Sequence, residues 1–440
     1  MAETNFLLTT PESWHLATDP NFCLSTNDCS YFSTGSDLVG FISIALVCLI
    51  TFFIASKWPE TFKFIFAALI LRILIMLVGH YVITLPDTTQ DASGFELVAW
   101  NSAQHGFSHV INNYPGYNSF FYPWMVSIIY SLFGRSVLMI QSVGLFFGVL
   151  SVLLGWLLAK KLWDNNSAMK VGWTLALFPS LALYSIIPLR EVYSSFFLLV
   201  AIIGMVDWVK GGGFKSIFLV ILAFICAIHF HAVLMVGGMI FFIIVGLSNF
   251  KKSLNLLYNK RVGIKSLIII IPIVIFFIAY FSGNIEIAYI GNFEDLFDSR
   301  RLESNIEGRM TGDASYPDWT LISSPIEIIY KGIARFAYFL FSPFPWDIKK
   351  LSHIVALFDG LLYMVLVYLI YLNRKAIWKD PALRMILVLL SIYIFIYGIG
   401  SSNFGASFRH RTKFLIEMII LAAPLIPKFI FSKNKIRKYD

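Results

Sequence analysis

Long apolar runs divide the chain into segments that predict membrane-crossing helices. Each run has about 17 to 24 residues, the length that a helix rising 1.5 Å per residue needs to cross roughly 30 Å of hydrocarbon. Strand-type alternation of polar and apolar positions is absent, which argues against a β-barrel. We therefore expect an all-α fold, a polytopic transmembrane helical bundle of about eleven spans. The expected spans lie near 38–55, 62–84, 137–160, 167–187, 190–208, 215–231, 233–250, 265–283, 353–372, 383–400 and 412–431.

Basic residues collect in alternate short loops and predict the orientation of these spans. Examples are the loop that holds Lys160 and Lys161, and the tail 433–438. By the positive-inside rule, such loops and the C-terminus are cytoplasmic, and the N-terminus is then extracytoplasmic. Cys23 and Cys29 suit that location, because they are spaced to form a small disulfide loop in an oxidising compartment.

The apolar segment 118–134 is a special case. A full crossing there would place every later lysine cluster outside or the loop 85–117 inside. We therefore expect a short juxtamembrane or re-entrant helix that is opened by Pro123. The polar N-terminal segment lacks the basic region and short apolar stretch of a cleavable signal peptide.

The resulting domain organisation is simple, since we find no internal repeat and no low-complexity linker. We expect an extracytoplasmic N-terminal segment, 1–37, and a single transmembrane domain, 38–440, with extracytoplasmic loops at 85–136 and 284–352. The expected location is the cell (inner) membrane, as a multi-pass protein in contact with membrane lipids.

Composition supports this class of protein and excludes others. Of the 440 residues, 58% are hydrophobic and 14% are charged, whereas a soluble domain usually carries about a quarter charged residues. The net charge of +8 is mostly an insertion signal, so no nucleic-acid partner is expected. The chain has no glycine-rich phosphate loop with Lys-Ser/Thr, no HExxH and no CxxC pair, which argues against ATP-driven transport.

The first long loop predicts a helix that begins near Asp91. Phe95, Val98 and Ala99 recur at helical spacing, so this helix is expected to lie along the membrane surface with its apolar stripe down. A carboxylate at a helix start can cap free amides. Taken alone, Asp91 therefore leaves a capping interpretation and a catalytic interpretation open.

Four stretches together resemble one family of membrane enzymes. They are DASGFELVAW from residue 91, YPGYNSFFYPWMVSIIYSLFGRSVLMIQSVGLFFGVLSVLLGWLLAKKLW from 114, ALFPSLALYSIIPLREVYSSFFLLV from 176 and SNFGASFRHRTKFL from 402. In order and sidedness they are similar to the GT-C superfamily of membrane glycosyltransferases, in particular to its polyprenyl-phosphate-dependent, protein mannosyltransferase-like bacterial branch. The likeness spans roughly residues 60–210 and 330–425.

This resemblance implies sugar transfer on the extracytoplasmic face, from a polyprenyl-phosphate- or diphosphate-linked sugar to a glycan or lipid-linked acceptor, in surface-polysaccharide biosynthesis. A carboxylate would deprotonate or orient the acceptor hydroxyl. Asp91 matches the acidic position of the family; Glu96 is the second candidate, and Asp87 is a spare. The chain lacks two adjacent acids at this position, so the two-carboxylate versions of the family are a poorer match.

The leaving phosphate calls for cations on the same side. Arg190, Arg409 and Arg411 break the positive-inside trend, although snorkelling to lipid head groups also explains such arginines. We expect these residues, with the adjacent Glu191 and His410, to bind the lipid phosphate or the glycan.

The second long loop offers further cations. Arg300, Arg301, Arg309 and Arg335 are candidate diphosphate or glycan contacts, although a solvated, salt-bridged loop explains the first three equally well. The apolar segment 331–343 predicts a helix in the membrane interface.

No cofactor is implied. His229 and His231 could in principle bind a divalent metal, but residues two apart on a helix point to different sides, so no metal site is predicted. Two alternative functions stay open. One is a polymerase of lipid-linked repeat units, of the O-antigen polymerase type, and the other is a transporter or flippase for lipid-linked sugars, although the chain lacks the matching halves typical of transporters.

Overall fold

The computed structural model describes residues 37–88, 91–116, 118–244, 306–307, 310 and 312–428. Within these ranges the chain is helical and forms no strand, apart from an isolated bridge between Ser315 and Asn403. The all-α prediction is confirmed for this part of the chain. Cys23, Cys29, Arg300, Arg301, Arg309 and the predicted span 265–283 lie outside the described residues.

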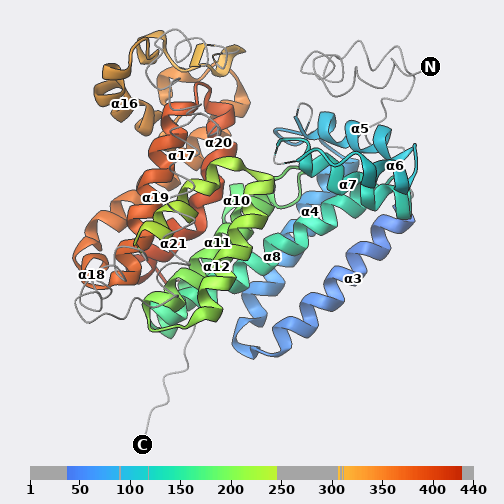
Figure 1. Ribbon diagram of the computed structural model, residues 1–440, viewed down its shortest axis with the longest axis horizontal. Coiled ribbons are helices and arrows are strands. Elements are labelled where there is room, and N and C mark those ends of the chain that lie inside the picture. Colours follow the sequence, from blue (N-terminus) through green and yellow to red (C-terminus); the bar gives the residue numbers. More distant parts are fainter. Residues whose placement is uncertain are drawn as a thin grey trace, which may run out of the picture.

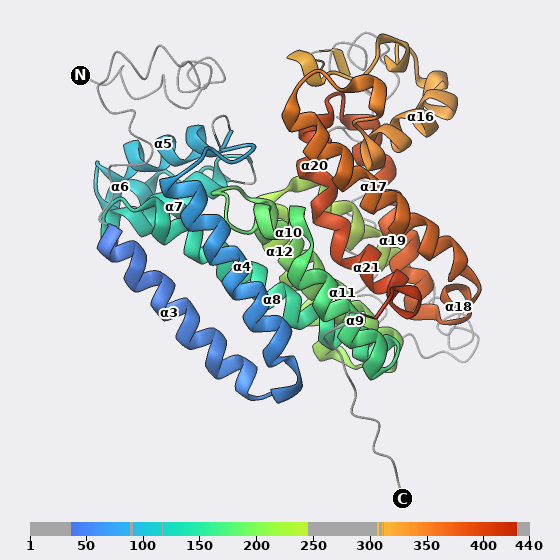
Figure 2. The ribbon, with the colours of Figure 1, turned by 180° about the vertical axis from the view of Figure 1, so that it is seen from behind.

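The helices lie in three neighbouring groups (Figures 1 and 2). The first group contains α3 (Asp37–Ser56), α4 (Phe62–Tyr81), α5 (Asp91–Ala103), α6 (Phe107–Asn112), α7 (Phe121–Phe133) and α8 (Val137–Leu162). The central group contains α9 (Asn165–Leu177), α10 (Pro179–Tyr184), α11 (Glu191–Val209) and α12 (Phe214–Phe230). The last contains α16 (Ile328–Phe341), α17 (Leu351–Leu372), α18 (Arg374–Lys379), α19 (Pro381–Gly400), α20 (Phe404–Arg411) and α21 (Leu415–Ala422).

Six helical segments of the described chain are long and apolar enough to cross a membrane. They correspond to the predicted spans 38–55, 62–84, 137–160, 190–208, 353–372 and 383–400. Only 28% of the apolar window in α3 and 22% of that in α17 are buried inside the structure, as expected for helices whose surfaces face lipid. The apolar helices therefore indicate a membrane protein.

One further predicted span is interrupted in the structure. The span predicted at 412–431 is interrupted, because α21 has eight residues and lies between 3-10 turns at Thr412–Phe414 (η7) and Ala423–Leu425 (η8). Residues 214–230 form a helix of 17 residues at the position of the predicted span 215–231, and the predicted span 233–250 is described only as far as residue 244. The segment 118–134 contains α7, a helix of 13 residues, which is too short to span ~30 Å as a single helix.

The prediction of one helix over 167–187 is wrong, and Pro179 explains why. Proline has no amide hydrogen, so it cannot donate to the carbonyl of Leu175 four residues earlier, and it forces the preceding Phe178 into an extended conformation. Arg72 of α4 replaces the missing donor: its guanidinium nitrogens lie 3.3 Å from the Leu175 oxygen and 2.9 Å from the Ala176 oxygen. This fully buried arginine therefore closes a broken helix inside the bundle.

The same side chain fixes how α8 packs. Arg72 Nε donates to Ser185 Oγ at 3.0 Å, at the end of the central broken helix. A Cβ atom on Gly148 of α8 would lie 2.4 Å from the Cβ atom of Ser185, so only glycine allows this approach. The turn after α10 is thereby held against α8, close to the start of α11.

The two ends of the bundle carry different chemistry. At one end, which we call the α18 end, Lys160 lies 2.5 Å from Glu60, Lys161 pairs with Asp207, and Lys210 donates to the carbonyl of Lys161. Figures 1 and 2 show α5, α6 and α7 at the opposite end, which we call the α5 end. Lys160, Lys161 and Lys210 thus lie at one end of the bundle, and the helix that begins at Asp91 lies at the other.

Candidate functional site

Side chains from four separate segments meet around Arg409, the sixth residue of α20. Nη1 of Arg409 pairs with the carboxylate of Asp91, the first residue of α5. Nε of Arg409 lies 3.2 Å from Oε1 of Glu191, the first residue of α11. The Arg409 side chain is 14% exposed and that of Asp91 is 32% exposed. The cluster is therefore partly open, and the structure brings together three residues that the sequence analysis named separately.

Glu191 lies at the closed side of this cluster. Its carboxylate is 2% exposed, and Lys413 Nζ and His410 Nδ1 lie 3.6 Å and 3.8 Å from its Oε1 atom. Neither carboxylate oxygen has a hydrogen-bond partner among the described residues. Glu191 is therefore a buried carboxylate that forms ion pairs with Arg409 and Lys413 but no hydrogen bond with a described residue.

His410 and Lys413 form a close pair beside this acid. Lys413 Nζ lies 2.7 Å from His410 Nδ1. When Lys413 is protonated it can only donate, so Nδ1 is then the acceptor and the histidine proton is on Nε2. Burial lowers the pKa of His410 well below its ordinary value, and the positive charges of Lys413 and Arg409 lower it further. His410 is therefore a neutral acceptor at neutral pH.

A second histidine and a tyrosine complete the inner wall. The Tyr397 hydroxyl lies 2.8 Å from His231 Nδ1, and the rings of His231 and His410 are perpendicular with centroids 5.5 Å apart. Lys413 Nζ lies 5.3 Å from the centroid of the Tyr397 ring, within cation–π range. These contacts hold the basic turn 409–413 against α19 and the end of α12.

Local sequence explains why these side chains converge. The Asn403 side chain accepts from the amides of Gly405 and Ala406, which caps α20 and sets its direction toward the cluster. Glu191 occupies the first turn of α11, where the helix dipole favours a negative charge.

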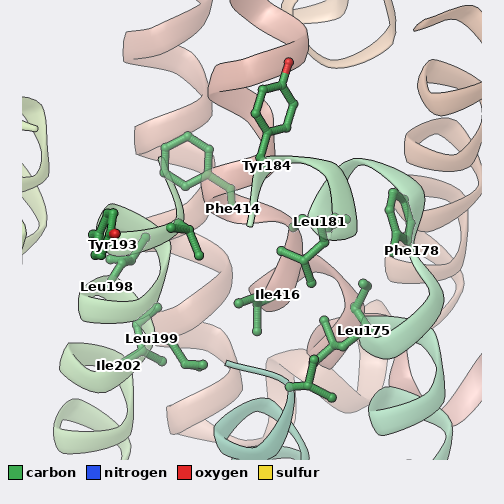
Figure 3. Packing of buried hydrophobic residues seen from close by; sticks show 14 of the residues in the cluster. Leu175, Phe178, Leu181, Tyr184, Tyr193, Leu198, Leu199, Ile202, Phe414 and Ile416 are labelled. Atoms are coloured by element: carbon green, nitrogen blue, oxygen red, sulfur yellow. The ribbon is translucent and has the colours of Figure 1, made fainter. Parts of the chain in front are cut away.

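Asp87 lies beside the cluster, in a turn that comes before α5 in the chain. Its backbone has a φ of 62°, the left-handed region that Asp tolerates better than most residues. Its carboxylate accepts a hydrogen bond from the Tyr184 hydroxyl. Figure 3 shows this hydroxyl pointing out of the apolar cluster formed by residues such as Leu181 and Phe414. Burial raises the pKa of Asp87, and the Tyr184 hydrogen bond and the charge of Arg409 oppose this only in part.

Arg190 adds a cation that is not engaged. Its guanidinium carbon lies 6.0 Å from the centroid of the Phe95 ring. Within the described ranges, the structure gives its guanidinium no hydrogen bond and no ion pair, although it lies close enough to Glu191 to act on that carboxylate. Arg190 can therefore offer its donors to an anion.

Glu96 belongs to a different cluster. Its carboxylate accepts from Arg135 Nε at 2.9 Å and from Arg135 Nη2 at 2.8 Å, in the bidentate geometry typical of strong pairs, and from the Tyr130 hydroxyl at 2.9 Å. Glu96 is 2% exposed. The pair joins α5 to the end of α7, and the structure does not bring Glu96 to Arg409.

Arg411 and Arg335 are also placed away from the cluster, and both are buried. Arg411 donates to Asp359 at 2.8 Å and to the carbonyls of Leu340 and Ser342 at 2.9 Å and 2.8 Å. Arg335, on α16, donates to Thr320, Ser401 and Ser402. These contacts hold α16 and the segment after it against α17, α19 and α20.

Sequence reasoning missed several residues of the cluster: Lys413, Tyr184, His231 and Tyr397 as contact residues, and Asp87 as more than a spare acid. A signal existed for Lys413, because it closes the same basic run as Arg409. No local signal marks Tyr184 or Tyr397, which reach the cluster only through the fold.

Comparisons with known proteins identify no relative. No protein-family model, no curated protein and no solved structure matches this chain. In the part of the chain that the structure describes, no group of three or more His, Cys, Asp or Glu residues could hold a metal ion.

Proposed function

We propose that this protein is a membrane glycosyltransferase that takes sugar from a polyprenyl-phosphate- or diphosphate-linked donor to a glycan or lipid-linked acceptor outside the cytoplasm. The observation that carries the proposal is the sharing of Arg409 between Asp91 and Glu191, beside the unengaged Arg190. Sugar transfer from a lipid phosphate needs an acid near the acceptor and cations near the leaving group. The resemblance of four sequence stretches to GT-C enzymes supplies the reaction class.

The cations suit a leaving phosphate. Arginine binds phosphate through its fixed fork of donors, and Arg190 has those donors available within the described structure. Arg409 is partly exposed and is held by two acids, so an arriving phosphate could exchange with one of them. Glu191 then keeps the cationic groups gathered while the site is empty.

The position of the cluster in the helical bundle suits a donor with a polyprenyl tail. The cluster lies at the α5 end, away from the lysines of the α18 end, and by the positive-inside rule the α5 end is extracytoplasmic. A lipid donor in that leaflet would present its phosphate near the membrane surface, where α5 and α20 meet.

The test uses cells whose only copy of the gene carries Asp91→Asn or Arg409→Gln. We expect lipid-linked sugar to accumulate and the mature surface glycan to shorten or disappear, because removing one group that stabilises transition-state charge lowers a rate by about 10²–10³-fold. Arg384→Gln is the matched control, since Arg384 is an exposed arginine of α19 outside the cluster. Protein levels are compared in every strain.

The outcome also separates the alternatives. An accumulated precursor with one sugar supports a single-sugar transferase, and a precursor with a whole repeat unit supports a polymerase. Unchanged glycans and precursors in both variants, at normal protein level, would refute the enzymatic proposal and favour transport or a scaffolding role.

A further inference from the structure

Three carboxylates surround Arg409, but they differ in what they contact. Asp91 and Glu191 each form an ion pair with Arg409. Asp87 forms no ion pair with any residue of the described ranges, and its carboxylate oxygen accepts a hydrogen bond from Tyr184. A carboxylate that is paired with a guanidinium is stabilised as an anion and is a weak base. Asp87 is therefore chemically the most suitable of the three to accept a proton.

The turn that holds Asp87 does not need its carboxylate. The Thr88 side chain donates to the Leu85 carbonyl at 2.6 Å, and the Thr88 amide lies 3.4 Å from the same oxygen. These contacts close the turn without Asp87. A left-handed non-glycine residue persists where its surroundings hold it, and such residues are concentrated at functional sites. The Tyr184 contact thus aims Asp87 into the cluster rather than along its own backbone.

We propose that Asp87, rather than Asp91, is the catalytic residue that takes the proton from the acceptor hydroxyl, while Asp91 positions Arg409. This assignment rests on the proposed function. The acceptor oxygen bonds to the anomeric carbon, and its proton passes to the Asp87 carboxylate. The bond from the anomeric carbon to the phosphate oxygen breaks, and its electron pair leaves with the phosphate toward Arg409 and Arg190. Asp87 then releases its proton to water.

The charged surroundings of Asp87 support this role. The groups that face it are Tyr184 from α10, Glu191 from α11, Asp91 from α5 and Arg409 from α20. Burial is the largest effect and raises the pKa of Asp87, and the two neighbouring acids raise it too. A base whose pKa lies nearer the working pH is a better catalyst than an ordinary aspartate, whose pKa is about 3.9.

The experiment uses membranes that contain the full chain and the lipid-linked sugars of its own cells. The rate at which lipid-linked sugar is consumed is measured between about pH 4.5 and 8 for the unchanged protein and for Asp87→Asn, Asp87→Glu, Asp91→Asn and Arg409→Gln. Asp318→Asn is the matched control, because Asp318 is an exposed acid outside the cluster. Binding of undecaprenyl phosphate to each purified variant in lipid nanodiscs is measured in parallel.

We expect Asp87→Asn to lower consumption by about 10²–10⁴-fold and to abolish the fall in rate at low pH, while undecaprenyl phosphate binding stays within about twofold. Asp87→Glu should restore part of the rate together with the low-pH fall. Asp91→Asn should lower the rate but keep the low-pH fall, since Asp87 still titrates.

Two results would overturn the assignment while leaving the proposed function intact: an Asp87→Asn rate within about threefold of the unchanged protein, or a low-pH fall that persists in Asp87→Asn and is lost in Asp91→Asn. The proposed function itself fails if the unchanged protein consumes no lipid-linked sugar and Arg409→Gln does not weaken undecaprenyl phosphate binding. In that case the assignment of Asp87 falls with it.

Discussion

Glu96 and Glu191 are buried acids that contact arginine in different ways. Glu96 accepts three hydrogen bonds at 2.8–2.9 Å from Arg135 and Tyr130. Glu191, which is just as buried, has nitrogen atoms of Arg409, Lys413 and His410 at 3.2 Å, 3.6 Å and 3.8 Å and no hydrogen bond to either oxygen from a described residue. The first arrangement is complete, and the second leaves bonding capacity for something else.

The difference distinguishes a structural ion pair, at Glu96, from the proposed binding site, at Glu191. Buried polar groups in folded proteins are normally satisfied, and exceptions call for an explanation such as an absent ligand or a functional role. The Glu96 pair ties α5 to the end of α7 and needs nothing more. Glu191 lies near Arg409, Lys413 and His410 without a hydrogen bond from a described residue, which agrees with the proposed anion-binding role.

The largest expected effect comes from breaking the complete pair. Arg135→Ala should lower the free energy of unfolding by about 3–5 kcal/mol, because Glu96 is left as an uncompensated buried charge. Denaturant or thermal unfolding in detergent measures this change. The double variant Glu96→Gln with Arg135→Gln removes both charges and should recover much of the loss. If Arg135→Ala does not lower the free energy of unfolding, the pair is not a structural ion pair that stabilises the fold.

A smaller effect is expected from the third hydrogen bond of the same acid. Tyr130→Phe removes the hydroxyl that donates to Glu96 and keeps the ring, which packs against Trp100. Hydrogen bonds to charged groups contribute about 1.5–3 kcal/mol, so stability should fall by that amount. Tyr371→Phe, at an exposed tyrosine of α17, serves as the control and should change stability by less than about 0.5 kcal/mol. Equal effects in both variants would contradict the structural role of Tyr130.

The contrast between these two acids could not be predicted from the sequence. The order of apolar runs correctly located six helices that are long and apolar enough to cross a membrane, because hydrophobic length is a local property. The same pattern predicted outer positions for Asp91, Glu191 and Arg409. Their convergence did not, since Asp91 and Arg409 are 318 residues apart and nothing local reports which acid reaches which cation.

Glu96 and Lys413 show the limits most clearly. Glu96 shares a helix with Asp91, so sequence reasoning grouped the two, but its side chain lies on the face that meets Arg135. Lys413 falls at the start of the predicted span 412–431 and was treated as part of it, whereas the chain there is a 3-10 turn inside the cluster. The break at Pro179 was visible in the sequence, but its compensation by Arg72 depends on tertiary packing.

The smallest expected effect sharpens the comparison from the side of the ligand. A site with available donors should be stabilised by an anion, so undecaprenyl phosphate at about ten times its dissociation constant should add about 1.4 kcal/mol to the free energy of unfolding. Arg190→Gln should weaken this stabilisation, because the guanidinium of Arg190 lies over the Phe95 ring but forms no hydrogen bond or ion pair with a described residue. Tyr130→Phe, although less stable without ligand, should keep the full stabilisation by undecaprenyl phosphate. Glu96 stays paired with Arg135 in this variant, away from Arg409. Arg384→Gln controls for general loss of positive charge. If Arg190→Gln keeps the stabilisation by undecaprenyl phosphate and Tyr130→Phe loses it, the phosphate does not bind at the cluster around Arg409. The distinction between a structural ion pair at Glu96 and a binding site at Glu191 is then wrong.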